Sequence, residues 1–172
     1  LQNCVVYDNG SRGFYLSNSS GTNTMTLNNV TVWGHSTYGV QISYSSGAQT
    51  VRIRNSIIAE NGNTGIYNNG GANVTLGAND VWGQAASYSG VSAGPGSISA
   101  APQFVDTAAR NFHLLPSSPA IDVADAVTSA TVDSEGLPRP LDGNGAGGAQ
   151  PDMGAFEYNP SANRWPVADG AS

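Results

Sequence analysis

The sequence predicts an all-β fold, a right-handed parallel β-helix that winds as a single-stranded solenoid and ends in a C-terminal cap. Three observations favour this fold: a repeat with a period of 23 to 26 residues, short alternating apolar stretches, and a composition rich in Gly, Asn, Ser and Thr. Charged residues make up only 10% of the 172 residues, and all six basic residues are Arg. Without Lys, Glu and Leu at helical spacing, a long helical bundle or coiled coil is excluded.

The repeat begins at the first residue. LQNCVVYDNG at 1–10 recurs as LNNVTVWGHS at 27–36 and IRNSIIAENG at 53–62, and a degenerate copy, LGANDVWGQA, occupies 76–85. This period is too short for a propeller blade of about 40–45 residues. It fits one coil of a parallel β-helix, in which equivalent residues of successive coils stack about 4.8 Å apart. We therefore expect about four coils over residues 1–88.

Stacking predicts which side chains face the interior. The inward columns are Phe14, Val40 and Ile66; Leu16 and Ile42; Met25, Val51 and Val74; Leu1, Leu27, Ile53 and Leu76; and Val6, Val32, Ile58 and Val81. One turn of each coil carries Asn3, Asn29 and Asn55, followed by Ala78. We expect these Asn side chains to form a ladder of stacked amides that bond to one another and to turn backbone. A ligand site is the alternative.

Two outward columns carry aromatic side chains. The first is Tyr7, Trp33, Ala59 and Trp82, and the second is Tyr15, Gln41 and Tyr67. Aromatic rings at regular spacing on a rigid surface can stack on the C–H faces of sugars, which makes these five rings candidates for carbohydrate binding. The alternative is that they cover strand edges or pack beneath loops, since single exposed aromatic residues are common.

A pair of carboxylates offers a catalytic alternative. Asp8 and Glu60 share a column with Gly34 between them, which places them about 10 Å apart, near the separation found in inverting glycosidases. His35 lies beside the gap. Asp and Gly also occupy turns for conformational reasons alone. A polysaccharide lyase would need calcium-binding carboxylates with a nearby Arg or Lys base, and the columns supply no such cluster.

The charge distribution excludes other partners. The net charge is −6, and the whole acidic excess lies in residues 91–172, which hold three Arg and nine acidic residues. Without a basic patch we expect no nucleic-acid binding. No run of about 18 apolar residues exists, so no membrane span is expected. Cys4 is the only cysteine, which leaves no internal disulfide and no cysteine metal cluster.

The second half carries a set of motifs in a fixed order after the coils: PQFVD, NFHLLPSSPAID, DSEGLPRPLDGNG and PDMGAFEY. This set resembles the C-terminal region of secreted bacterial right-handed parallel β-helix proteins of the choice-of-anchor type Q class. The matching positions are Pro102, Phe104, Phe112, Leu114, residues 118–122, Gly136, Pro138, Arg139 and residues 152–158. Ala101 and the Val123-Ala124 pair depart from the family pattern. The resemblance implies a secreted or cell-surface protein, without implying one reaction.

We expect residues 89–158 to cap the last coil, because an open coil end exposes unpaired backbone groups. The side chains expected to pack there are Phe104, Phe112, Leu114, Leu115, Ile121, Met153 and Phe156. Arg139 should pair with Asp122, Asp152 or Glu157. His113 alternates with apolar neighbours and should face solvent.

A loop in this region is a candidate calcium site. Asp142 and Asn144 alternate with Gly, as oxygen ligands do in loops that bind hard cations, and Asp152 completes the candidate set. Ordinary turn chemistry explains the same residues. No other cofactor is expected.

Residues 159–172 are polar and interrupted by Pro, which predicts a linker. Their N-R-x-PVAD segment resembles connectors that introduce immunoglobulin-like modules in bacterial surface proteins, so further domains are expected in a longer parent. Because the chain starts within the repeat, we also expect upstream coils or another chain to cover the N-terminal coil.

Three functions remain open. The first is a non-catalytic polysaccharide-binding or adhesive module of a secreted multi-domain bacterial protein. The second is a polysaccharide lyase or glycoside hydrolase of the pectate-lyase-like type. The third is a structural stalk, which would be indifferent to replacement of the outward aromatic residues. The fold alone cannot choose among them.

Overall fold

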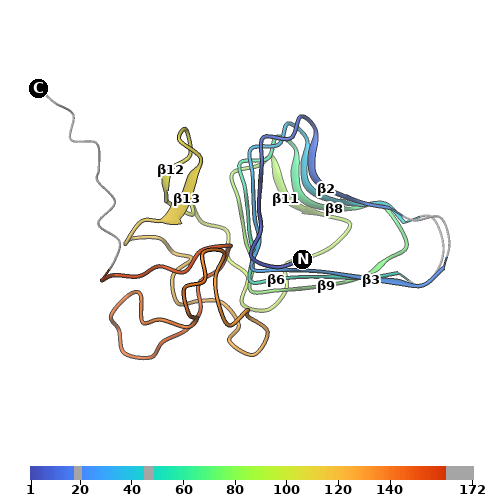
Figure 1. Cartoon of the computed structure of the whole chain (residues 1–172). Coiled ribbons are helices and arrows are strands. Elements are labelled where there is room, and N and C mark those ends of the chain that lie inside the picture. Colours follow the sequence, from blue (N-terminus) through green and yellow to red (C-terminus); the bar gives the residue numbers. More distant parts are fainter. Residues whose placement is uncertain (18–20, 45–48, 162–172) are drawn as a thin grey trace, which may run out of the picture.

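The computed structural model describes residues 1–17, 21–44 and 49–161 and shows a solenoid flanked by a C-terminal region (Figure 1). The chain winds in right-handed coils, and each complete coil holds three short strands. The strands of the first coil are β1 (Val5–Tyr7), β2 (Arg12–Leu16) and β3 (Asn23–Asn28). Those of the next two coils are β4 (Thr31–Trp33), β5 (Tyr38–Ile42), β6 (Gln49–Arg54), β7 (Ile57–Ala59), β8 (Thr64–Asn68) and β9 (Asn73–Gly77).

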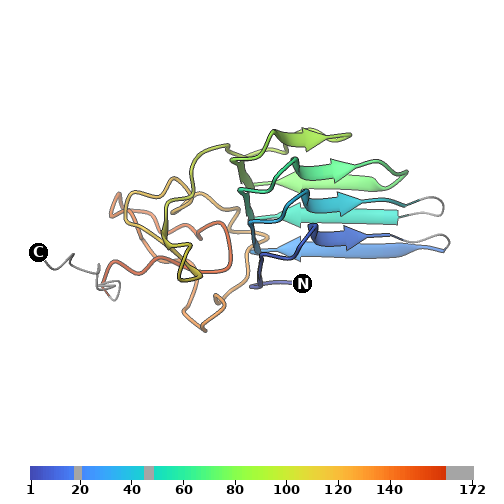
Figure 2. The same cartoon turned by 90° about the horizontal axis from the view of Figure 1, so that it is seen from above.

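Corresponding strands of successive coils pair in parallel. The sheets of the solenoid have the orders β1-β4-β7-β10, β2-β5-β8-β11 and β3-β6-β9, where β10 (Asp80–Trp82) and β11 (Ala86–Ser89) belong to a fourth coil. Figure 2 shows the coils stacked one above another. The predicted parallel β-helix is therefore confirmed, with three complete coils and part of a fourth in the described residues.

The register of these sheets confirms the inward columns, except that Leu1, which was expected to face the interior, is 60% exposed. In one of them Val6 pairs with Val32, Val32 with Ile58, and Ile58 with Val81. Leu27 and Ile53 pair in the same way in the β3-β6-β9 sheet, and both are completely buried. Alternation along each strand sends these side chains into the coil, where they stack on their equivalents above and below.

Left-handed backbone forms the two corners on either side of each strand in the β1-β4-β7-β10 sheet. The first corner holds Asn3, Asn29, Asn55 and Ala78 at φ of 50–54°, and the second holds Asp8, Gly34, Glu60 and Gly83 at φ of 51–81°. Gly, Asn and Asp tolerate this conformation better than most residues. The need for a one-residue corner therefore explains much of the polar pattern of the repeat.

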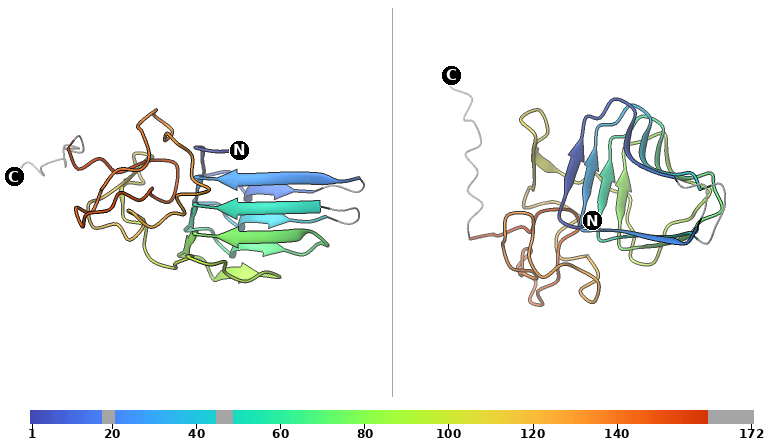
Figure 3. Two further views of the ribbon diagram at one scale, coloured as in Figure 1. Left: turned by 90° about the horizontal axis from the view of Figure 1, so that it is seen from below. Right: turned by 45° about the vertical axis from the view of Figure 1, so that its right-hand side comes forward.

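Residues 94–98 cover the edge of the last coil, where Val81 N donates to Ile98 O at 3.1 Å and Ala78 N donates to Pro95 O at 2.8 Å. The rest of the C-terminal region, residues 101–158, lies along the side of the solenoid, which corrects the predicted cap for these residues (Figure 3). It packs on the outer face of the β1-β4-β7-β10 sheet, where Ile57 and Ala59 are buried against Leu114, Ile121 and Met153. The physical reason is that the middle coils present small and apolar side chains outward on this face. Leu115, which was expected in the packed set, is 37% exposed.

The hairpin strands of this region are β12 (Phe104–Asp106) and β13 (Asn111–Leu114), and they pair antiparallel. His113 is not solvent-facing as expected, because its ring stacks on Phe156 with centroids 4.1 Å apart and its Nε2 lies 3.3 Å from a carboxylate oxygen of Glu135. Sequence alternation predicted only which face of β13 it occupies, and that face is covered by residues near the chain end.

The Asn column fastens the C-terminal region to the coils, so the predicted amide ladder is wrong. Asn29 accepts a hydrogen bond from Ala130 N at 2.9 Å and donates from Nδ2 to Asp152 O at 3.3 Å. Asn55 accepts from Asp125 N at 2.9 Å and donates to Asp125 O at 3.3 Å. Each side chain therefore satisfies backbone of the flanking region and does not bond to the next Asn of the column, although Asn55 Nδ2 also donates to Asn28 Oδ1 at 3.2 Å.

Replacing Asn55 with Ala should lower the free energy of unfolding by about 1–3 kcal/mol, because the partly buried N–H and C=O of Asp125 lose their partner. Chemical denaturation measures the loss. Asn55→Gly accommodates the left-handed corner and also lacks the amide, so it should lose about as much. A full recovery of stability in the Gly variant would contradict the fastening role and assign the effect to backbone strain.

Residues 162–172, which hold most of the predicted linker and its N-R-x-PVAD segment, lie outside the described residues. Within the described part, no helix is long and apolar enough to cross a membrane. Cover of the N-terminal coil by upstream coils or another chain stays a prediction.

Candidate functional site

The first outward aromatic column forms one wall of a pocket. Trp33 and Trp82 each pair with Ala59, so the small side chain stands between two indoles. Ala59 is completely buried, whereas both Trp side chains are half-buried. Because the Trp-bearing strands are two strand spacings apart, about 9.6 Å, the missing bulk at Ala59 leaves a gap. The pocket at this gap, which we call the tryptophan pocket, has a volume of about 360 Å³.

The opposite wall of the tryptophan pocket comes from the segment that leads into hairpin β12–β13. Its lining residues there are Ala101, Pro102, Gln103, Phe104 and Thr107. The hairpin holds this segment in place: Phe104 meets Phe112 edge to face at 5.3 Å, and Leu115 N donates to Gln103 O at 2.9 Å. The repeat could not predict this wall, because its last copy ends before these residues.

Glu60 supplies a carboxylate at the pocket. Its side chain extends over Gly83 in the next coil, where a Cβ would stand 2.8 Å from Glu60 Oε1. The glycine therefore serves both the left-handed corner and the space that Glu60 occupies. Within the described residues no ion pair engages Glu60, so its oxygens can accept hydrogen bonds from a ligand.

The other catalytic candidates do not join Glu60. Asp8 forms an ion pair with Arg110. His35 is 1% exposed; its Nδ1 accepts from Asn9 N at 3.1 Å, and its Nε2 lies 3.3 Å from Val6 O. The imidazole therefore joins neighbouring coils. Of Asp8, His35 and Glu60, only Glu60 lines the tryptophan pocket.

Tyr7 lies at the far end of the same column and is partly covered. Its ring contacts Phe112 with centroids 5.4 Å apart, and Phe112 also contacts Trp33 at 5.6 Å. The guanidinium of Arg110 lies 5.6 Å from the Tyr7 ring and 5.9 Å from Trp33. At this end of the column the aromatic rings pack against hairpin β12–β13. This matches the alternative to carbohydrate binding, in which outward rings pack beneath other segments.

The second aromatic column lies on the β2-β5-β8-β11 sheet, on the side of the solenoid away from the C-terminal region (Figure 1). Tyr15 is 54% exposed, and Arg12 lies 5.0 Å from its ring centre and donates to Gln41. Tyr67 stacks on Tyr38 at 4.8 Å. Sequence reasoning missed Tyr38, although the period aligns it with Arg12 and so could have placed it on this face.

The three calcium candidates serve the local backbone. Asp142 Oδ2 accepts from Gly147 N at 3.2 Å, and Asn144 Oδ1 accepts from Ala146 N at 2.8 Å. Asp152 is buried and accepts from Tyr158 N at 2.5 Å. Among the residues that the structure describes, no group of three or more His, Cys, Asp or Glu side chains is placed to hold a metal ion. Calcium binding by this set stays a prediction.

Arg139 forms the predicted ion pair, and its partner is Glu157. Nη1 lies 3.1 Å from Glu157 Oε2, and both side chains are completely buried. The guanidinium also donates to Asp152 O at 2.7 Å and Gly154 O at 2.9 Å. Burial raises the pKa of Glu157. Burial is also the main cause that raises the pKa of Asp152 to about 8, and the negative charge of Glu157 adds to that rise. This centre organises the end of the C-terminal region.

Residues 1–52 match a family model described as a right handed beta helix region. The match covers the first two coils, and its description agrees with the parallel strand order found throughout the solenoid. No curated protein matches the chain, and no solved structure matches it either. The chain is thus a right-handed parallel β-helix with a laterally docked C-terminal region.

Proposed function

We propose that this chain is a non-catalytic polysaccharide-binding module, and that the tryptophan pocket holds one pyranose unit. The observation that carries the proposal is the column Trp33, Ala59, Trp82, with its pocket of about 360 Å³. A pyranose ring that stacks its two C–H faces on two aromatic planes needs at least about 7–8 Å, twice a carbon–carbon contact distance. The spacing of about 9.6 Å between the Trp-bearing strands leaves that room.

Polar groups around the pocket suit a sugar. Glu60 can accept hydrogen bonds from ring hydroxyls, and the Gln103 amide can both donate and accept. A mostly apolar pocket with a few polar groups is typical of small-ligand sites. Glycoside hydrolysis commonly uses two carboxylates flanking the scissile bond, whereas Asp8 is paired with Arg110. Binding without turnover is the function that this arrangement favours.

The location of the module follows from the resemblance of residues 102–158 to choice-of-anchor type Q regions. That resemblance supports a secreted or cell-surface protein whose other domains act beside this one. In such a protein the coils present the tryptophan pocket to an extracellular glycan.

Affinity electrophoresis on soluble plant and microbial polysaccharides, together with pull-down on insoluble ones, tests the proposal. Trp82→Ala should weaken retention about 30-fold, as expected for loss of an aromatic anchor worth about 2 kcal/mol. Tyr15→Ala removes an exposed ring on the opposite side of the solenoid and should change retention less than about twofold. Repeating the series with EDTA tests the calcium prediction.

The same incubations distinguish the other two functions. Reducing ends or unsaturated products that disappear in Glu60→Gln would replace the proposal with an enzyme. Equal retention of the Trp82→Ala and parent chains would remove the tryptophan pocket as the site. Absence of retention on every polysaccharide, with both variants folded, would favour the stalk.

A further inference from the structure

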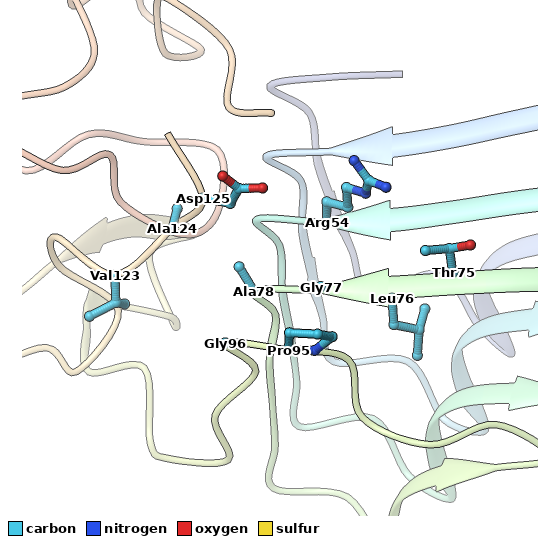
Figure 4. A pocket seen from close by; sticks show the side chains of 10 residues that line it. All are labelled: Arg54, Thr75, Leu76, Gly77, Ala78, Pro95, Gly96, Val123, Ala124 and Asp125. Carbon is cyan, nitrogen blue, oxygen red and sulfur yellow. The ribbon is translucent and has the colours of Figure 1, made fainter. Parts of the chain in front are cut away.

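A second pocket, of about 450 Å³, lies where the C-terminal region meets a corner of the coils (Figure 4). The side chains that bound it are Arg54 and Thr75 on the solenoid, Ala78 and Pro95 at the corner, and Val123 and Asp125 on the C-terminal region. None of these residues lines the tryptophan pocket. The two pockets are therefore separate sites.

Arg54 brings an uncompensated positive charge to this corner pocket. The Arg110 and Arg139 side chains pair with Asp8 and Glu157. Within the described residues, by contrast, no hydrogen bond or ion pair engages the half-buried side chain of Arg54. A guanidinium offers five N–H donors in a planar fork that matches a carboxylate in a bidentate pair. The pocket therefore presents donors suited to a carboxylate.

Asp125, on the opposite wall of the corner pocket, is held in place by the residue that follows Arg54 at the end of β6. Asp125 Oδ1 accepts from Val127 N at 3.0 Å, and Oδ2 accepts from Thr128 Oγ1 at 2.9 Å, which orients the carboxylate. Asn55, the residue after Arg54, bonds to both the N–H and the C=O of Asp125. The strand end that carries Arg54 and the segment that carries Asp125 are thus joined before any ligand binds, which lowers the entropy cost of binding.

We propose that the corner pocket binds a uronic-acid unit of an acidic polysaccharide. The sugar carboxylate pairs with Arg54, ring hydroxyls donate to the free lone pairs of Asp125, and a C–H face of the ring packs on Ala78 and Pro95. A neutral sugar would leave Arg54 unpaired, and inorganic phosphate or sulfate would offer no C–H face to Ala78 and Pro95. An acidic peptide would supply a carboxylate without the ring of hydroxyl donors. The inference does not depend on the tryptophan pocket.

A titration of the ¹⁵N-labelled chain with two matched tetrasaccharides tests this site. A β-1,4-linked glucuronate tetramer and cellotetraose differ only at C6, which is a carboxylate in one and a hydroxymethyl group in the other. The glucuronate tetramer should shift the amides of Gly77, Gly96 and Ala124 and should bind there at least about tenfold more tightly than cellotetraose. Trp82→Ala should leave these shifts unchanged, so failure at one pocket is distinguishable from failure at the other.

Variants at two neighbouring arginines sharpen the test. Arg54→Met should weaken binding of the glucuronate tetramer at least about tenfold. Arg52→Met should change it less than about twofold, because Arg52 lies two residues away on the outer side of β6 and does not line the pocket. Asp125→Asn keeps the acceptor for Val127 N and should weaken binding as well, which preserves the test if Arg54→Met does not fold.

Several results would overturn the assignment. Equal affinity for the two tetrasaccharides would show that Arg54 does not bind the sugar carboxylate. Equal losses in Arg54→Met and Arg52→Met would indicate non-specific attraction of charge. Absence of amide shifts with the glucuronate tetramer would remove the site, and tighter binding of a tetra-aspartate peptide would assign the pocket to peptides.

Discussion

Replacing Arg139 with Met is expected to lower the free energy of unfolding by about 3–5 kcal/mol, the usual cost of removing one partner of a buried ion pair. The guanidinium is completely buried against Glu157 and donates to the carbonyls of Asp152 and Gly154. The variant leaves the Glu157 carboxylate without its cation and two carbonyls without a donor. Urea denaturation followed by Trp fluorescence measures the loss.

Hydrogen exchange locates where that loss acts. The amides of residues 152–158 should exchange faster in Arg139→Met, while the inward-packed strands of the coils stay protected longer. Arg110→Met is the matched control, because the ion pair between Arg110 and Asp8 is exposed to solvent and should contribute about 1 kcal/mol or less. Comparable losses in both variants would contradict the central role of Arg139.

Asp80→Asn is expected to stabilise the chain at pH 8 by about 2 kcal/mol and to leave it nearly unchanged at pH 4. Burial raises the pKa of Asp80 to about 6 from 3.8. Its Oδ1 accepts from Ala100 N at 3.0 Å, whereas its buried Oδ2 has no hydrogen-bond partner in the described structure. Ionisation of this carboxylate therefore leaves a charge with little compensation.

The direction of the pH effect follows from linkage. A folded pKa above the unfolded one means that the contribution of Asp80 is fully present below about pH 4 and is lost as the pH rises through about 6. The full loss is about 3 kcal/mol at 1.36 kcal/mol per pKa unit. Asn removes the charge and keeps the acceptor for Ala100 N, but its buried NH₂ offsets part of the gain.

Thermal unfolding at the two pH values measures this effect. The Tm of Asp80→Asn should exceed that of the parent by about 4–8 °C at pH 8, given about 2–4 °C for each kcal/mol in a domain of this size. Asp106→Asn, which replaces an exposed carboxylate, is the control for a surface Asp-to-Asn change and should alter the free energy of unfolding by no more than about 0.5 kcal/mol. The idea fails if Asp80→Asn gains as much at pH 4 as at pH 8.

The repeat allowed the coils to be predicted in register, because its period determines which residues stack. Leu27 on Ile53 and Trp33 beside Ala59 follow from counting alone. The wall of the tryptophan pocket does not, since residues 101–107 lie beyond the last repeat copy. Periodicity places an element along the solenoid axis but does not indicate what docks on its side.

The Asn column and His35 show the same limit. A corner Asn has an amide that can bond equally well to its neighbour in the stack or to another segment, and the sequence pattern is identical in both cases. His35 aligns with Asn9 and Asn61, which predicted its corner but not that its imidazole turns inward. Both outcomes depend on which packing partner is present, and that partner lies far away in the sequence.

Solenoids can usually gain or lose whole repeats during evolution, because each repeat touches only its neighbours. Here each of three successive coils is hydrogen-bonded to a different point of one non-repetitive segment. Asn3 donates to Val132 O, Asn29 donates to Asp152 O, and Asn55 donates to Asp125 O. Inserting a duplicated 26-residue unit between two of these coils would move one Asn side chain about 4.8 Å farther from its backbone acceptor. The fixed spacing of these three contacts on the flanking segment therefore restricts how many coils can lie between them. The same contacts couple the unfolding of the three coils into one cooperative event.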